Sequence, residues 1–290
     1  MKYILTLVLL IANLSAYDAF IKPTTLRANI KKSNLILLDV SSKDSYAKGH
    51  ILSALHINID DFMNSTKTLT QIISSSKTQE IFTNLGINND SDIILYSRNS
   101  DEEQLNTSYF AMILILSGFE NVSILNGGYM SWVFKYNRLV SSIAVKNSKD
   151  GEFKIHPNNN ILVTSQYIKD NLETASIIDS RDTPYYFGTK LSKNTKSYGH
   201  ISHAKSSYYK DKFLKDYTLR SNQDLVSIYV HGLMLNKNSD IIVYGNSIFD
   251  ASMNWFILYQ KLRLKNTKIY EASLSEWGNL NLDMTKFKWE

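Results

Sequence analysis

The sequence predicts an α/β protein of two tandem domains, each with a central parallel sheet flanked by helices. Short apolar runs that end in a polar residue alternate with apolar stretches of helical spacing, a pattern typical of βαβ units. In addition, four landmarks occur twice, in the same order, at offsets of 140 to 150 residues. A period of that length indicates two whole domains rather than a solenoid.

The repeated landmarks are three short motifs and a tryptophan. An apolar run ends in Asp, a Gly-His-Ile triplet follows, a second apolar run ends in Tyr, and a Trp comes last. The two sets are Asp39, 49–51, Tyr96 and Trp132 in the first half, and Asp179, 199–201, Tyr244 and Trp277 in the second. The same order in both halves is hard to obtain by chance, so the repeat fixes two domains.

Composition bounds the class of protein. The 290 residues are 43% hydrophobic and 20% charged, as in soluble globular proteins, and they suffice for two cores. The net charge of +5 is spread without a run of basic residues, which argues against nucleic-acid binding. The chain has no Cys, which excludes a disulfide, a thiolate metal site and a cysteine nucleophile.

Residues 1–16 have the pattern of a secretory signal peptide. Lys2 precedes an apolar stretch at 4–12, and Ala16 offers a small residue for cleavage. The stretch is shorter than the ~20 residues of a membrane-spanning helix. We therefore expect an exported, periplasmic protein with no stable membrane insertion after cleavage. The alternatives are a retained N-terminal anchor or a misassigned start.

The elements follow in order along the two domains, 21–140 and 161–290. In the first, we expect strands at 35–40, 54–59, 92–96 and 122–125, and helices at 42–47 and 109–116, the latter capped by Thr107-Ser108. An acidic loop at 97–106 precedes that second helix, and 126–128 form a turn. A polar linker at 141–160 leads to a helix opening at Thr164-Ser165, strands at 175–179, 241–244 and 268–270, and a helix at 251–262.

These motifs together resemble the rhodanese family. The carriers are Asp179-Ser180-Arg181, the triplet Gly199-His200-Ile201 with Ala204 after it, and Leu125-Asn126-Gly127-Gly128 followed by Trp132. The two-domain form is similar to thiosulfate and 3-mercaptopyruvate sulfurtransferases. The resemblance implies an active site in the C-terminal copy near the domain interface. There, a loop Cys would carry sulfane sulfur and inward-pointing backbone N–H groups would hold the anionic donor.

The chain departs from the family pattern at that site. The corresponding loop reads Gly245, Asn246, Ser247, Ile248, Phe249, Asp250. Gly245 lies at the position of the Cys, so the site has no nucleophile. Asp250 lies where relatives have a neutral or basic residue, and Tyr185 replaces a substrate-binding Arg. Tyr185 and Arg181 are the remaining candidates for ligand binding.

The other candidates favour structural roles. Ser97 and Ser247 have no neighbouring His to act as a base and are interpreted as loop serines. His50 and His200 are expected to hydrogen-bond a nearby turn. His203 has no third ligand within reach, so no metal site is expected. The two repeated tryptophans, Trp132 and Trp277, are expected in the core. No cofactor motif is present.

The sequence thus favours a non-catalytic tandem rhodanese-like protein. We expect a small anion or sulfur-containing ligand, or a protein partner, to bind in the pocket beneath Gly245, where the lost thiol would leave room. The alternative is a sulfurtransferase-type enzyme of sulfur metabolism that uses an external thiol or persulfide carrier instead of its own cysteine. Neither reading requires a cofactor.

Overall fold

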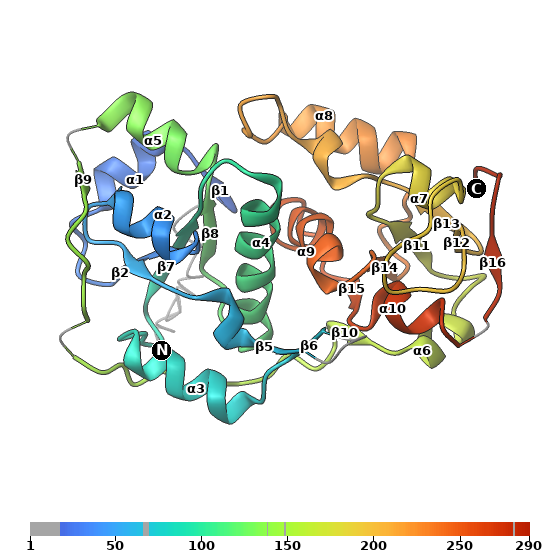
Figure 1. The fold of residues 1–290 in the computed structure, drawn as a ribbon, viewed down its shortest axis with the longest axis horizontal. Coiled ribbons are helices and arrows are strands. Elements are labelled where there is room, and N and C mark those ends of the chain that lie inside the picture. The colour runs from blue at the N-terminus through green and yellow to red at the C-terminus, as the bar shows by residue number, and fades with distance from the viewer. Residues whose placement is uncertain (1–17, 66–69, 138, 148, 281) are drawn as a thin grey trace, which may run out of the picture.

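The computed structural model describes residues 18–65, 70–137, 139–147, 149–280 and 282–290. The expected signal peptide at 1–16 lies outside these residues. Two lobes stand side by side in Figure 1, one for each repeat, with helices α4 (Asp101–Leu116) and α9 (Ile248–Phe256) between them. In the part of the chain that is described, no helix is both long and apolar enough to cross a membrane.

The first lobe is built on a five-stranded parallel sheet. Its spatial order is β1 (Phe20–Ile21), β8 (Val122–Leu125), β7 (Asp92–Tyr96), β2 (Leu35–Asp39) and β4 (Leu55–His56). The strand expected at 54–59 shortens to β4, because a 3₁₀ turn begins at Ile59. The surrounding helices are α1 (Pro23–Asn29), α2 (Lys43–Lys48), α3 (Ser75–Asn84) and α5 (Gly128–Tyr136).

The second lobe repeats this sheet strand for strand. Its order is β10 (Leu162–Val163), β15 (Thr267–Tyr270), β14 (Ile241–Tyr244), β11 (Ser176–Asp179) and β13 (Ala204–Ser206), again all parallel. The remaining helices are α6 (Ser165–Asp170), α7 (Thr183–Phe187), α8 (Asn222–Val226) and α10 (Ser273–Trp277). Each lobe also has a separate two-stranded antiparallel sheet: β3 (His50–Ile51) with β9 (Val140–Ser141), and β12 (His200–Ile201) with β16 (Met284–Thr285). The α/β class and the tandem arrangement are confirmed.

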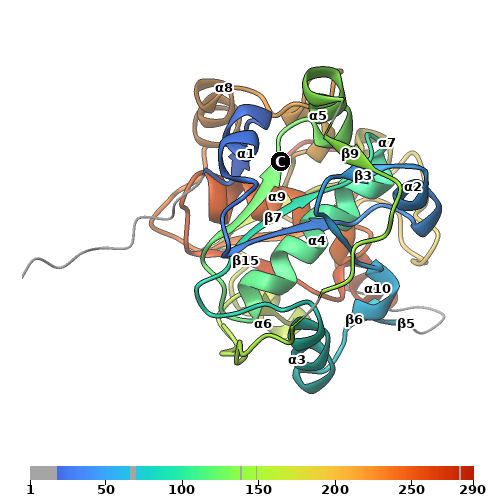
Figure 2. The same ribbon diagram turned by 90° about the vertical axis from the view of Figure 1, so that its left-hand side faces the viewer.

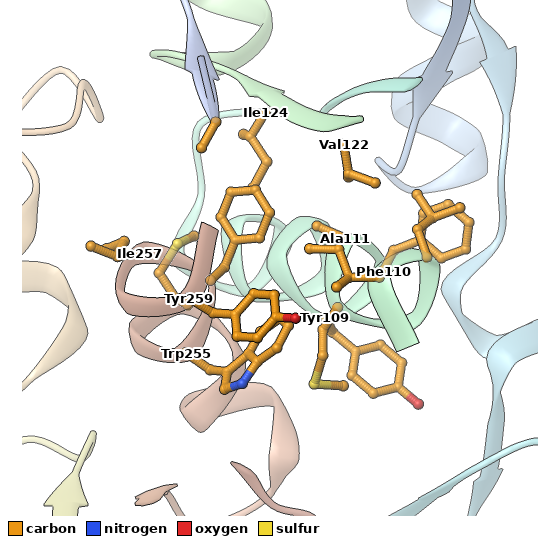
Figure 3. Close-up of a cluster of buried hydrophobic side chains, with 14 of the residues drawn as sticks. Tyr109, Phe110, Ala111, Val122, Ile124, Trp255, Ile257 and Tyr259 are labelled. Carbon is orange, nitrogen blue, oxygen red and sulfur yellow. The ribbon is translucent and has the colours of Figure 1, made fainter. Parts of the chain in front are cut away.

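The two lobes share one hydrophobic core. Alternate residues of a strand face opposite sides of its sheet. Ile93 and Leu95 of β7 therefore join the cluster that spans both lobes, while Ile94 and Tyr96 face the outer helices. Helices α4 and α9 pack against each other inside the shared cluster, and Tyr109 of α4 stacks on Phe249 of α9 with ring centroids 4.2 Å apart. Figure 3 shows Tyr109, Phe110 and Ala111 on α4 beside Trp255 on α9 and Tyr259 just after it. The view in Figure 2, turned by 90°, keeps the two helices together in the middle of the molecule.

Helix α4 begins earlier than the sequence suggested. The expected loop at 97–106 and the cap at Thr107-Ser108 are wrong: Ser100 is the N-cap, and its side chain accepts a hydrogen bond from the Glu103 N–H at 3.3 Å. The three acidic residues at 101–103 form the first helical turn, where the helix dipole favours negative charge. Thr107 and Ser108 sit inside the helix because their hydroxyls bond backwards to the carbonyls of Glu103 and Leu105.

Helix α9 also begins early, at Ile248 rather than 251, so the loop that precedes it is short. It continues as a π-helical turn at Ile257–Lys261.

The polar linker expected at 141–160 packs against the first lobe. Phe153 is buried and stacks on Phe119 with ring centroids 3.8 Å apart, and its N–H donates to the Ile87 carbonyl.

Candidate functional site

The candidate site forms where strand β14 ends. The buried Tyr244 hydroxyl donates to Asp179 Oδ2 at 2.8 Å and accepts the Ile201 N–H at 3.1 Å. Burial raises the pKa of Tyr244 well above its ordinary value, so the phenol stays protonated. This contact ties the end of the strand to the Gly-His-Ile turn and fixes where the next residue, Gly245, lies.

Asp250 closes the loop that follows. Its carboxylate Oδ2 accepts the N–H groups of Asn246 at 3.0 Å and Ser247 at 3.3 Å, and with Ser247 it forms the capping box of α9. Burial raises the pKa of Asp250, and the two N–H donors offset only part of that rise. The backbone amides that the family resemblance assigns to an anionic donor are therefore bound to a carboxylate of the chain itself.

There is no room for a side chain at Gly245. A Cβ placed there would lie 2.4 Å from Asp250 Cβ, 3.0 Å from the Ser247 carbonyl oxygen and 3.1 Å from the Ala251 nitrogen. The expectation that the lost thiol leaves an open pocket beneath Gly245 is wrong, because Asp250 and the first turn of α9 fill that space. We refer to residues 245–247, drawn in by Asp250, as the closed loop.

Arg181 lies behind the closed loop rather than in an open pocket. Its side chain is buried and makes a two-pronged contact with Asp179, with Nε at 2.9 Å from Oδ1 and Nη2 at 2.5 Å from Oδ2. Nη2 also donates to the Gly199 carbonyl at 2.7 Å. Arg181 is linked to the loop through Ser192, whose hydroxyl lies 3.4 Å from Nη1 and donates to Asn246 Oδ1 at 2.5 Å.

A cleft of about 220 Å³ opens on the outer side of the closed loop. Its lining combines apolar surface, including Leu274, with side chains that carry hydroxyl, amide and ammonium groups: Tyr185, Ser192, Lys193, Thr195, Asn246 and Ser275. The candidate Tyr185 thus lines the cleft, and Lys190 Nζ lies 4.7 Å from the centre of its ring. We call this cavity the outer cleft.

One wall of the outer cleft is an insertion that the sequence reasoning missed. In the first lobe α2 leads directly into Gly49, whereas in the second lobe residues 189–198 separate the end of α7 from Gly199. The segment is held by α10 and the residues after it, since Ser197 Oγ donates to the Gly278 carbonyl and Asn279 Nδ2 to the Asn194 carbonyl. The signal was present in the sequence, because the offset between repeats rises from 140 to 150 residues across this stretch.

The first lobe closes its equivalent loop in another way. Ser97 is buried, and its hydroxyl donates to the Glu103 carbonyl at 3.0 Å and accepts from Thr107 at 2.8 Å. Arg98 donates to the carbonyl of Gly49, as Arg181 does to that of Gly199, although it comes from the loop after β7 rather than after β2. The sequence reasoning did not single out Arg98, since no motif marks it.

The repeated histidines are structural, as expected. His50 Nδ1 lies 3.0 Å from the Tyr46 carbonyl, and His200 Nδ1 lies 2.8 Å from the Tyr186 carbonyl. Each imidazole stacks on the same tyrosine with centroids 3.8 Å apart. His203 is exposed beside Glu173. Among the described residues no three His, Asp or Glu side chains are grouped to hold a metal.

Both lobes match a known family. The model of the rhodanese-like domain matches residues 22–135 and again 164–280. The chain therefore belongs to the rhodanese family, as two domains in tandem that lack the catalytic cysteine.

Its relatives include proteins that handle sulfur. The sulfur carrier protein TtuD of Thermus thermophilus is 26% identical over 248 residues, which cover 81% of this chain and 84% of that protein. The 3-mercaptopyruvate sulfotransferase SseA of Escherichia coli superposes with a TM-score of 0.75 at 22% identity, over 89% of this chain and 99% of SseA. EanB in complex with ergothioneine gives 0.82 at 18% identity, over 96% of this chain and 72% of that one. The structural likenesses establish the fold.

Proposed function

We propose that this chain is a non-catalytic member of the rhodanese family that binds a small polar or sulfur-containing ligand in the outer cleft. One observation carries the proposal: the nucleophile position holds Gly245, and no side chain fits there while Asp250 caps the loop. The binding site that remains lies outside the loop, between it and the inserted segment 189–198.

The chemistry of sulfur transfer supports this reading. A persulfide forms on a thiolate, which is soft and nucleophilic at neutral pH, and the chain has no cysteine. A serine would need an adjacent base to act as a nucleophile. The hydroxyl of Ser97 instead donates to a backbone carbonyl, and no histidine contacts it in the described structure.

The outer cleft has the size and lining of a site for a small polar molecule. Its volume of about 220 Å³ lies below the ~300–1,000 Å³ of sites for drug-sized ligands. Ser192, Thr195 and Ser275 are largely buried there, and Ser275 and Ser192 already fix the orientation of Asn246. A ligand would therefore meet donors and acceptors that are held in place beforehand, which lowers the entropic cost of binding.

Two assays on the purified chain test the proposal. Thiosulfate:cyanide and 3-mercaptopyruvate sulfurtransferase assays should show no turnover above the uncatalysed rate. Turnover near the ~1–10³ s⁻¹ of ordinary enzymes would overturn the proposal. The same assays with added glutathione test the carrier alternative, because catalysis that appears only with an external thiol would favour it.

Ligand binding is tested by nuclear magnetic resonance with a library of small polar and sulfur-containing compounds. Binders should shift the amides of residues 192–195 and 246–247. An Asn194→Trp variant, which places a bulky ring at the exposed edge of the outer cleft, should abolish those shifts and leave the rest of the spectrum intact. Hits that move other amides only, or that bind the variant equally well, would place the ligand elsewhere.

We also propose that residues 1–16 direct export to the periplasm. Protein isolated from its native cells should then begin near residue 17, as read by intact mass. A chain that retains Met1 and fractionates with the cytoplasm would contradict this.

A further inference from the structure

Two helices of the second lobe begin with the same pattern, Ser-x-x-Asp, and yet use it differently. In α8 the exposed Asp224 carboxylate accepts the Ser221 hydroxyl at 2.8 Å. In α9 the Asp250 carboxylate turns back across the N-cap and accepts the N–H groups of both Asn246 and Ser247. Asp250 therefore binds two successive amides of the loop itself.

Hydrogen bonds from backbone N–H groups to a carboxylate are charge-assisted and stronger than neutral ones. A tethered carboxylate also competes at a high effective concentration, because its covalent link has already removed most of the entropic cost of association. A dissolved dianion would have to displace Asp250 and then remain close to its negative charge. Arg181 offers little help, since its guanidinium already pairs with Asp179.

We propose that Asp250 is a specificity-determining residue that occupies the amides of the closed loop and so excludes small anions such as thiosulfate from it. The inference rests on the proposed function, since it concerns which ligands the same site accepts. It narrows the ligand of the outer cleft to molecules that bind through its hydroxyl and amide groups and not through the loop amides.

The test is a thiosulfate titration followed by nuclear magnetic resonance at constant ionic strength. The observed signals are the backbone amides of Asn246 and Ser247. In the wild-type chain they should not shift. Asp250→Gly removes the carboxylate and should give saturable shifts, with an affinity at least tenfold above that of the wild type. The matched control is Asp224→Gly, which removes the equivalent carboxylate from α8 and should behave as the wild type does.

The Asp250→Asn variant distinguishes occupation of the loop amides by the side chain from electrostatic repulsion of thiosulfate by its negative charge. Its amide oxygen can still accept the two loop N–H groups, so this neutral variant should continue to exclude thiosulfate. If Asp250→Asn binds thiosulfate as well as Asp250→Gly does, repulsion rather than occupancy is responsible and the inference is overturned. It is also overturned if the wild type binds at these amides, or if Asp250→Gly binds no better than Asp224→Gly.

Should Asp250→Gly fail to fold, Asp250→Ser carries the same expectation with a side chain too short to bridge to both amides. Failure of the proposed function would look different, because sulfurtransferase turnover by the wild-type chain is measured separately. A chain that is inactive and yet binds thiosulfate at the loop would refute only the inference about Asp250.

Discussion

Replacing Gly245 with Ala adds one methyl group where the structure has no space for it. The new carbon would lie 2.4 Å from Asp250 Cβ, whereas non-bonded carbons are at their best separation near ~3.5–4.0 Å. The other two close contacts, to the Ser247 oxygen and the Ala251 nitrogen, are with backbone atoms. None of these neighbours can rotate away, because a Cβ and two backbone atoms move only with the helix and the loop themselves.

We therefore expect Gly245→Ala to lower the free energy of unfolding by about 1–3 kcal/mol, the usual cost of overpacking an interior site. The measurement is urea denaturation followed by circular dichroism and by tryptophan fluorescence. Gly232→Ala is the matched control, since the same methyl there meets only the Ser227 oxygen, at 3.3 Å. That control should lower the free energy of unfolding by no more than about 0.5 kcal/mol.

The decisive step is a double-mutant cycle with Asp250→Gly. Alone, this change loses a cap worth about 0.5–2 kcal/mol and adds a flexible residue to a helix at a cost of about 1 kcal/mol. Combined with Gly245→Ala, it removes the carbon at the closest contact. The double variant should then lose at least about 1 kcal/mol less than the sum of the single losses. Losses that add within about 0.5 kcal/mol would refute the claim that Asp250 closes the loop.

Three other predictions follow from buried charge and from the missing thiol. Burial lowers the pKa of Lys212 to about 7, against about 10.4 in an unfolded chain. Between these pH values the folded chain binds fewer protons than the unfolded chain, so stability should rise with pH across that window. Lys212→Met should raise the Tm most at pH 6 and flatten its rise between pH 6 and 9, and a persisting rise would argue against a buried lysine as the cause. Arg181→Ala should cost about 3–5 kcal/mol in urea denaturation because Asp179 is left buried without its cation, and a loss under about 1 kcal/mol would mean that the pair is solvated. Gly245→Cys should show no gain of one sulfur atom in intact mass after incubation with thiosulfate, whereas a gain reversed by dithiothreitol would show that a functional site remains.

Much of the fold could be predicted because its signals are local and repeated. Strand β7 is an apolar run bounded by polar residues, and a strand buried on both faces of its sheet requires such a run. The presence of two similar domains could also be predicted, since each landmark occurs twice in the sequence. The start of α4 was missed because Thr107-Ser108 has the composition of a cap. Ser100 with Glu103 fits the capping-box pattern equally well. The structure buries both Thr107 and Ser108, and the Ser108 hydroxyl contacts that of Ser252 in the second lobe, which leaves neither free to cap a helix at the surface.

The candidate site was predictable in position but not in shape. The motifs placed Gly245 and Asp250 at the two ends of one loop, and the structure has Gly245 directly after β14 and Asp250 in the first turn of α9. It could not show that the Asp250 side chain folds back onto the loop, because that depends on the backbone path between them. The family pattern also assigned a binding role to the position of Tyr185, which the structure places on the wall of the outer cleft. The equivalence of Arg98 and Arg181 could not be seen in the sequence, because the two residues do not align between the repeats. Their side chains reach equivalent glycine carbonyls only in the folded structure.

Comparison of the two lobes distinguishes contacts that both share from features of the second lobe. The tyrosine at the end of β7 or β14 accepts the N–H of Ile51 in the first lobe and of Ile201 in the second, and an arginine binds the preceding glycine carbonyl in both. Both lobes have that last contact although Arg98 makes it from the loop after a different strand, which favours a structural role for Arg181. Among the described residues, the second lobe differs from the first in the inserted segment 189–198 and in the carboxylate of Asp250 across its loop, and the outer cleft lies between these two features. A function specific to this chain is therefore to be sought in that cleft, and substitutions of the exposed Lys193 and Asn194 should alter ligand binding with little effect on stability.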